Sequence, residues 1–163
     1  MEIRRMAAAD DRMAISRVFE ESWKYAYRGI VPQEYLDSLP EGRWADQMDD
    51  PERNTLLCVE GARIVGVVCF CRSRLEAFAD WGEISAIYLL PEYMGKGFGR
   101  AMMEAALAEL RVMGYHRFFL WVFEENARSR RFYEKAGFSF AGEAEEKDIS
   151  GKVLRLVRYA RVE

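Results

Sequence analysis

The stretch from Glu83 to Leu107 reads EISAIYLLPEYMGKGFGRAMMEAAL, and the rest of the chain is interpreted around it. Its first part, Ile84–Leu90, is a short apolar run rich in strand-forming residues, which predicts a buried strand. Pro91 has no backbone N–H to donate to a sheet ladder, so the strand is expected to stop pairing there. The chain then leaves the sheet for a glycine-rich loop.

The loop and the helix after it have the pattern of an anion site. Three glycines at alternate positions allow a ligand to approach the backbone closely: Gly95, Gly97 and Gly99. A helix is predicted from about Gly97, because apolar residues recur at helical spacing at Met103, Ala106, Leu107 and Leu110. The first N–H groups of a helix lack internal partners and carry partial positive charge, and Arg100 adds a full charge. The pattern favours a bound phosphate.

Two common phosphate motifs are absent from this loop. The chain has no GxxxxGK[ST] sequence, and Gly95–Arg100 reads GxGxG rather than GxGxxG, past mid-chain and without a preceding βαβ unit. From the residues alone, the loop is either a diphosphate site or a tight strand-to-helix turn without a ligand.

The same stretch resembles motif A of the GNAT superfamily, the Gcn5-related N-acetyltransferases. That pattern, [QR]-x-x-G-x-[GA] after a strand, falls on Met94, Gly97 and Gly99, with Met94 in place of the usual Gln or Arg. The residue at this position usually contributes through its backbone N–H, so binding is expected to survive the change. A second block, Asn126–Phe138 (NARSRRFYEKAGF), resembles the family's later motif N-x-x-[AS]-x-x-[FY]-Y-x-x-x-G-F. The two motifs stand in the family's order and spacing.

The resemblance implies a site for acetyl-CoA as cosubstrate. Its pyrophosphate is expected at the loop, from Met94 through Gly95, Lys96, Gly97, Phe98 and Gly99 to Arg100. The family's fold splays the strands at 84–90 and 117–123 apart at their C-terminal ends, and pantetheine lies between them. The backbone of the first strand is expected to pair with pantetheine at Ile87, Tyr88 and Leu89.

Length and composition predict one domain over residues 1–163. A net charge of −3 does not predict nucleic-acid binding. The N-terminus lacks the apolar segment of a signal peptide, and the longest apolar run, Ile64–Cys71, is too short to span a bilayer, so we expect a cytoplasmic protein without a membrane segment. The three cysteines are expected to be reduced packing residues, and a single histidine, His116, leaves no His-based metal cluster, so no metal is expected.

The remaining segments predict an α/β fold. Strands are expected at 2–6, 55–59, 62–72, 84–90, 117–123, 138–147 and 152–162, with a loop at 73–80. Helices are expected at 10–27, 33–39, 41–48, 97–113 and 127–136. Asp10 is predicted to cap the first of these helices, and Gly114 to end the one at 97–113. This order fits the GNAT architecture, a single mixed sheet of about seven strands flanked by helices.

Tyr133, inside the second motif, matches the family's tyrosine that protonates the departing CoA thiolate. A phenol with a pKa near 10 is a suitable acid for a thiol of about 8.5. The alternative is a helix tyrosine that packs in the core. Asn126 opens the predicted helix, where it serves as an N-cap, as an amide contact to CoA, or as both.

Glu83 stands eleven residues before Met94, where histone-acetylating members of the family have a glutamate as general base. An aliphatic amine with a pKa of about 10.4 is protonated at neutral pH, so a base would help it to attack. The alternative is a solvated charge at the start of a strand.

An aromatic segment falls where GNAT proteins place the loop over the acceptor, and it contains Trp23, Tyr25, Tyr27 and Arg28. Packing of Trp23 against Tyr27 is the alternative. An acidic run at Glu143–Glu146 is either a solvated face or an attraction for a cationic amine.

Together these features predict an N-acetyltransferase that moves acetyl directly to a primary amine, with a small cationic amine such as a polyamine as the expected acceptor. Protein or peptide amines remain open as acceptors, and a non-catalytic acyl-CoA-binding sensor remains open as another class. The sequence does not decide between a monomer and a homodimer.

Overall fold

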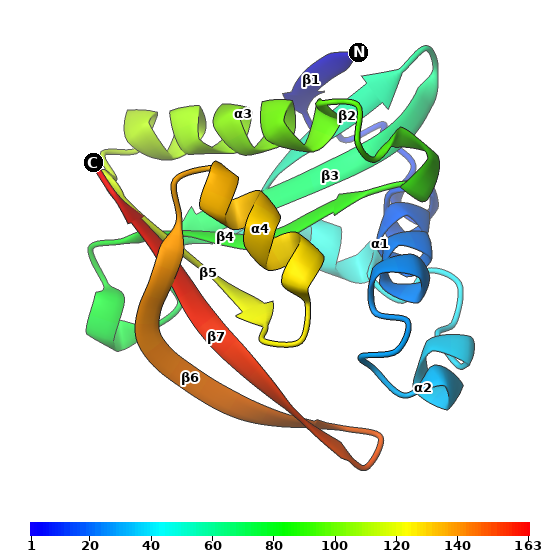
Figure 1. Ribbon diagram of the computed structural model, residues 1–163. Coiled ribbons are helices and arrows are strands. Elements are labelled where there is room, and N and C mark those ends of the chain that lie inside the picture. The colour runs from blue at the N-terminus through cyan, green and yellow to red at the C-terminus, as the bar shows by residue number, and fades with distance from the viewer.

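A seven-stranded mixed sheet runs through the computed structural model, which describes residues 1–163, in the order β1-β2-β3-β4-β5-β7-β6 (Figure 1). All neighbouring strands are antiparallel except β4 and β5, which are parallel. The strands are β1 (Glu2–Arg5), β2 (Asn54–Glu60), β3 (Arg63–Arg72), β4 (Gly82–Leu89), β5 (Arg117–Phe123), β6 (Ser139–Ile149) and β7 (Lys152–Val162). The predicted α/β fold with seven strands is confirmed.

Four α-helices and three short 3₁₀ segments connect the strands. The helices are α1 (Arg12–Ala26), α2 (Gln33–Asp37), α3 (Phe98–Val112) and α4 (Ala127–Lys135), and the 3₁₀ segments are η1 (Ala45–Asp49), η2 (Glu76–Phe78) and η3 (Pro91–Tyr93). Gly114 has a φ of +99° just beyond α3, as expected for the residue that ends this helix.

Strands β4 and β5 separate soon after they start. Gly82 and Glu83 of β4 pair with Phe118 and Phe119 of β5, and no further pairing joins the two strands. The edge of β4 that faces β5 is therefore open from Ile84 onward, which confirms the predicted splay.

Helices α1 and α3 cover opposite faces of the sheet beside this opening. Tyr88 packs against Phe19 of α1, with ring centroids 4.9 Å apart. Gly66, in register with the next residue of β4, faces Met102 of α3, whose sulfur would lie 2.7 Å from a Cβ at that glycine. Because successive strand residues point to opposite faces, the two helices sit on different sides of β3 and β4.

The start of α1 differs from the prediction. Asp11, rather than Asp10, caps the helix by accepting a hydrogen bond from the backbone N–H of Met13 at 2.9 Å. Asp10 instead forms a two-pronged ion pair with Arg4, at 2.8 and 2.9 Å. This pairing with β1 lowers the pKa of Asp10 to about 2 and removes its carboxylate from the helix end.

Two other segments differ in their local form. The helix predicted at 41–48 is the 3₁₀ helix η1, and the loop predicted at 73–80 contains η2. The chain between β3 and β4 packs as an aromatic cover rather than lying free: Phe78 stands 5.8 Å from Phe119. Short 3₁₀ turns of this kind lack the apolar periodicity that identifies longer helices.

One apolar core of 33 buried residues joins the helices to both faces of the sheet. Cys58, Cys69 and Cys71 are all free thiols buried within the strands, as expected for packing residues. None of the helices is both long and apolar enough to cross a lipid bilayer.

Candidate active site

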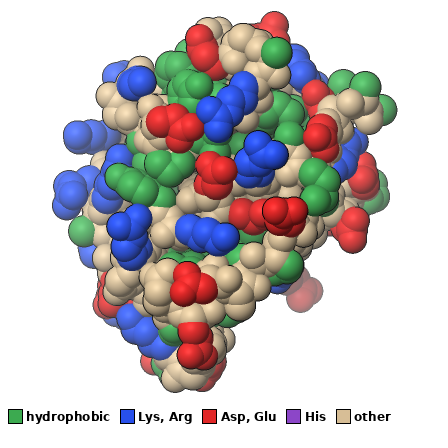
Figure 2. All heavy atoms as spheres, turned by 90° about the vertical axis from the view of Figure 1, so that its right-hand side faces the viewer, with side chains coloured by type: hydrophobic (Ala, Val, Ile, Leu, Met, Phe, Trp, Pro, Cys, Tyr) green, Lys and Arg blue, Asp and Glu red, His purple; other side chains and the backbone are tan.

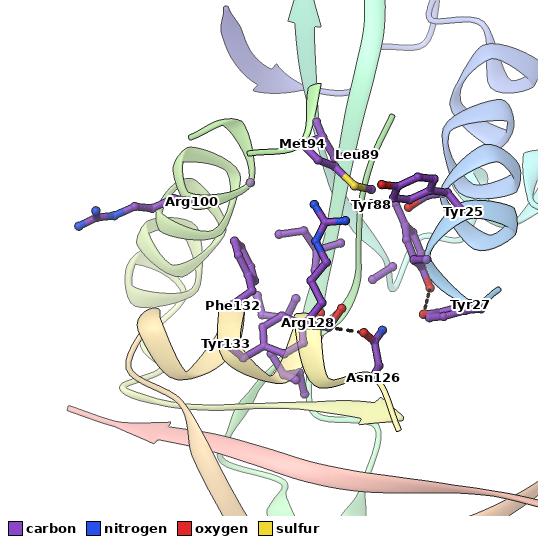
Figure 3. Close-up of a pocket in the computed structure, with 18 of the residues that line it drawn as sticks. Tyr25, Tyr27, Tyr88, Leu89, Met94, Arg100, Asn126, Arg128, Phe132 and Tyr133 are labelled. Carbon is purple, nitrogen blue, oxygen red and sulfur yellow. Dashed lines mark hydrogen bonds between the residues drawn. The ribbon is translucent and has the colours of Figure 1, made fainter. Parts of the chain in front are cut away.

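A cavity of 680 Å³ opens where β4 and β5 separate (Figure 3). Its lining comes from the end of α1, from β4, from the loop before α3, from β5 and from the start of α4. Segments that lie more than a hundred residues apart in the chain therefore converge on one site.

The glycine loop presents a row of free backbone donors to this cavity. None of the N–H groups from Gly95 to Arg100 donates a hydrogen bond to a backbone carbonyl, and α3 begins without a side-chain cap. Gly95 and Gly97 have φ values of +75° and +87°, a conformation that favours glycine. A Cβ at either glycine would meet no atom within 4 Å, so the space in front of the loop is open. Open, unpaired N–H groups at a helix start fit an anion.

Two details at this loop differ from expectation. The backbone N–H of Met94 donates a hydrogen bond to the carbonyl of Pro91 at 3.1 Å, so this N–H is already paired within the protein. Met94 still lines the cavity. The side chain of Arg100 points away from the other labelled side chains (Figure 3), so the unpaired donors at the loop are its backbone N–H groups.

Close packing joins α3 to α4 behind the loop. A Cβ at Gly99 would stand 3.2 Å from the ring of Phe132, tighter than an ordinary contact. The family's last motif glycine is thus needed for helix packing here, while Gly97 is needed for the turn.

Tyr133 of α4 lines the same cavity, close to two further tyrosines. The hydroxyls of Tyr27, just after α1, and Tyr88 of β4 lie 3.4 Å apart (Figure 3). Part of each ring faces the cavity, but burial among protein atoms raises the pKa of Tyr133 well above its usual value, and the pKa values of Tyr27 and Tyr88 are raised for the same reason. All three phenols hold their protons at neutral pH.

Asn126 is the N-cap of α4, which is one of the two roles expected for it. Its side-chain oxygen accepts a hydrogen bond from the backbone N–H of Ser129 at 3.1 Å, and the residue is 6% exposed and lines the cavity. The amide nitrogen has no partner among the protein's hydrogen bonds, so the cap leaves a donor available.

Glu83 does not reach the cavity. Its carboxylate is buried and held by Arg74, whose Nη2 donates at 2.6 Å and whose backbone N–H donates at 3.1 Å. The ion pair with Arg74 therefore holds Glu83 at the start of β4, outside the cavity lining, and its role as a base stays a prediction.

Twelve of the predicted site residues line the cavity. They are Tyr27, Arg28, Ile87, Tyr88, Leu89, Met94, Gly95, Gly97, Gly99, Arg100, Asn126 and Tyr133. Four do not: Glu83, Trp23, which packs on Tyr27 and Trp44, and Lys96 and Phe98, which both lie against the ring of Tyr93. For Trp23 the packing alternative is the one observed.

Tyr25, from the predicted acceptor segment, also lines the cavity, and so do several residues outside the predicted site, above all Arg128. Arg128 lies two residues after Asn126, within the quoted second motif, and its side chain extends from α4 into the cavity (Figure 3). The motif position was the available signal for Arg128. Trp121 of β5 gave no signal, because a tryptophan in an apolar strand is typical of a core.

Comparison with protein-family models gives one match. Residues 15–138 match the model of the acetyltransferase (GNAT) family, which spans most of the chain and both motifs. The chain belongs to the GNAT acetyltransferase family. It is accordingly an acetyl-CoA-dependent N-acetyltransferase, and the matched range includes the glycine loop at the start of α3.

The N-acetyltransferases that this chain is similar to in sequence agree with this assignment. The uncharacterized N-acetyltransferase Rv2669 of Mycobacterium tuberculosis is 36% identical over 139 residues, covering 84% of this chain and 86% of its own. YuaI of Bacillus subtilis, another uncharacterized N-acetyltransferase, is 31% identical over 75% of this chain and 72% of its own. A spermidine N(1)-acetyltransferase of Thermoplasma acidophilum is 26% identical over 85% of this chain and 88% of its own.

Solved structures show the same fold. The PaiA N-acetyltransferase of Thermoplasma acidophilum, in complex with coenzyme A, superposes with a TM-score of 0.75 at 22% identity, and all of both chains is covered. Another neighbour, a ribosomal-protein-alanine N-acetyltransferase from Brucella melitensis, has a TM-score of 0.75 at 18% identity over all of both chains. At these identities the likeness extends to the fold.

Proposed function

We propose that this GNAT protein transfers acetyl from acetyl-CoA directly to a small primary amine. The observation that carries the proposal is that Tyr133 and the row of free N–H groups at Gly95–Arg100 belong to one cavity. A proton donor and a diphosphate site on one continuous surface are what acetyl transfer from a CoA thioester requires. A sensor that only binds acyl-CoA has no need for the donor.

The roles of the residues follow from their positions. The loop's N–H groups hold the pyrophosphate, and the open edge of β4 at Ile87, Tyr88 and Leu89 pairs with the amides of pantetheine. The amine nitrogen attacks the thioester carbon, and a backbone N–H near Leu89 stabilises the oxyanion. As the C–S bond breaks, the hydroxyl of Tyr133 gives its proton to the sulfur, and the phenolate is reprotonated from solvent.

The acceptor must lose a proton before it attacks, and the cavity offers an electrostatic means. Its lining contains Arg28, Arg100 and Arg128 and not one Asp or Glu. A positive surrounding disfavours an ammonium group and so lowers the pKa of a bound amine. Water then removes the proton without a carboxylate base, which is consistent with the ion pair that holds Glu83.

A small cationic acceptor such as a polyamine has one direct support, the name of the Thermoplasma relative at 26% identity. The acidic run on β6 supports it less. Glu143, the first residue of the acidic run, accepts a hydrogen bond from Arg158 at 2.7 Å, and Figure 2 shows acidic and basic side chains interspersed on the face it displays. The proposal is therefore a small primary amine, with polyamines and peptide N-termini as named rivals.

The test combines acetyl-CoA binding with a screen for acetyl transfer. Calorimetry measures binding, and thiol release reports transfer to amino acids, polyamines, amino sugars and short peptides at one amine concentration. The proposal expects tight acetyl-CoA binding and transfer to at least one small amine. Binding without transfer to any amine would favour the sensor, and transfer restricted to peptides would replace the acceptor class.

A further inference from the structure

None of the three arginines that line the cavity has an acidic partner within the protein. Arg28, Arg100 and Arg128 take part in no ion pair and in no side-chain hydrogen bond. Elsewhere in the chain eleven arginines pair with a carboxylate or with the hydroxyl of Tyr159, namely Arg4, Arg5, Arg12, Arg63, Arg74, Arg111, Arg117, Arg130, Arg155, Arg158 and Arg161. The cavity thus concentrates positive charge that the protein itself leaves uncompensated.

Two of these guanidinium groups converge on one ring. The Cζ atoms of Arg28 and Arg128 both lie 5.8 Å from the ring centroid of Tyr25, which is 44% exposed. Arg28 follows α1 and Arg128 belongs to α4, so the pair reaches Tyr25 from separate elements (Figure 3 labels Tyr25 and Arg128). Like charges held near one another without a counter-charge favour a bound anion.

The position of this pair separates it from the diphosphate site. Tyr25 and Arg28 belong to α1 and the loop after it, and α1 covers the face of β4 opposite to α3. The free N–H groups at Gly95–Arg100 stand at the start of α3. The cavity therefore has one anion-binding element on the cofactor side and a second one toward α1.

We infer that the acceptor carries a carboxylate as well as its amine, and that Arg28 and Arg128 hold this carboxylate beside Tyr25. The inference rests on the proposed function, because it names the acceptor of that same site. Guanidinium groups suit a carboxylate because their planar N–H donors match its two oxygens. The acceptor class is that of small amino acids rather than polyamines.

A matched pair of acceptors tests the carboxylate. Each of several L-amino acids is compared with its carboxamide, which lacks only the carboxylate. Amidation also lowers the pKa of the neighbouring amine, so at a given pH the carboxamide has the larger fraction of unprotonated amine. Faster transfer to the amino acid than to its carboxamide therefore cannot result from a difference in amine protonation. We expect kcat/KM to be about 10–100-fold higher for the acid, and this ratio to shrink with added salt. Equal or faster transfer to the carboxamide, or to spermidine, would overturn the inference and leave acetyl transfer to amines standing.

The arginines are tested by Arg28→Met and Arg128→Met. Each should raise KM for the acid by about 10–100-fold and change KM for the carboxamide little. Arg131→Met is the matched control, because Arg131 is an exposed residue of α4 outside the cavity lining and without an ion pair. A loss of the same size for acid and carboxamide would contradict carboxylate binding.

The phosphates of the cofactor are the other source of an anion. Binding of CoA and of dephospho-CoA is therefore measured for both variants. The inference expects little change for either ligand, whereas weaker binding of CoA alone would assign the arginine to its 3′-phosphate. Transfer to aminoethyl phosphate with the same arginine dependence, and none to amino acids, would replace the carboxylate by a phosphate. Acetyl-CoA binding without transfer to any amine would remove the proposed function and the inference together.

Discussion

Arg74 holds the carboxylate of Glu83 through both its side chain and its backbone, with Nη2–Oε2 and N–Oε1 distances of 2.6 and 3.1 Å. Glu83 is 2% exposed, while the Arg74 side chain is 63% exposed. This contact closes the chain between β3 and β4 onto the start of β4. The carboxylate that the spacing predicts as a base is therefore engaged in an ion pair outside the cavity lining.

Glu83→Gln should cost stability rather than catalysis. The amide keeps the size of the side chain but loses a charge-assisted hydrogen bond, so the free energy of unfolding should fall by about 1–3 kcal/mol. Urea unfolding measures this change, and Arg74→Gln should reproduce most of it, with a strongly non-additive double variant. A fall in kcat of about 10²-fold with stability intact would return Glu83 to the mechanism.

Gly97→Asp should abolish acetyl-CoA binding. The substitution places a carboxylate before the loop's free N–H groups and forces a residue with a Cβ into a φ of +87°. Gly97→Ala separates the two effects, because its Cβ would meet no atom within 4 Å and adds strain without charge. Calorimetry should find weakened acetyl-CoA binding for Gly97→Ala and no detectable acetyl-CoA binding for Gly97→Asp. Equal binding by all three proteins would remove the loop from the cofactor site.

Asn126 combines a helix cap with a cavity position, and two variants separate these roles. Asn126→Ala removes the cap of α4 and should lower the free energy of unfolding by about 1 kcal/mol. Asn126→Asp keeps an oxygen for the backbone N–H of Ser129 but loses the amide donor. We expect Asn126→Asp to have near-native stability and to bind acetyl-CoA more weakly than the wild-type protein. Unchanged binding in both variants would leave Asn126 as a cap alone.

The pH dependence of the reaction follows from the buried phenols. Burial raises the pKa of Tyr133, so this general acid stays protonated through pH 10. kcat/KM should rise with pH as the amine loses its proton, and it should not fall again below pH 10. A descending limb near pH 9 that Tyr133→Phe abolishes would contradict the assigned state.

The same shifts set a limit to alkaline stability. Tyr27, Tyr88 and Tyr133 have pKa values raised in the folded protein, so their contribution is present below pH 10 and is lost as the pH rises above that value. Thermal unfolding recorded alongside the rates should show a melting temperature that declines from about pH 10 upward. The kinetic profile is interpreted below this range.

The sequence predicted those parts of the site that depend on backbone form. The strand that ends at Pro91, the positive φ of Gly97 and the cap at Asn126 are local requirements, and the motifs record them residue by residue. The central strands β3, β4 and β5 followed for the same reason, because each contains a continuous apolar run.

Side-chain partners could not be predicted in this way. Asp10 and Asp11 are equivalent caps in sequence, and only the approach of Arg4 from β1 decides between them. Glu83 matched a base by spacing, but Arg74 determines its environment. The convergence of Arg28 and Arg128 on Tyr25 joins residues a hundred positions apart, which no local pattern records.

The most direct test of the account is Tyr133→Phe under conditions where chemistry limits the wild-type rate. The variant keeps the ring that packs beside Phe132 and Phe138 and removes only the hydroxyl. We predict a fall in kcat of about 10²–10⁴-fold for the best acceptor, with acetyl-CoA affinity by calorimetry close to wild type. An unchanged kcat for the folded variant would contradict the assignment of Tyr133 as the acid on which the proposed transfer depends.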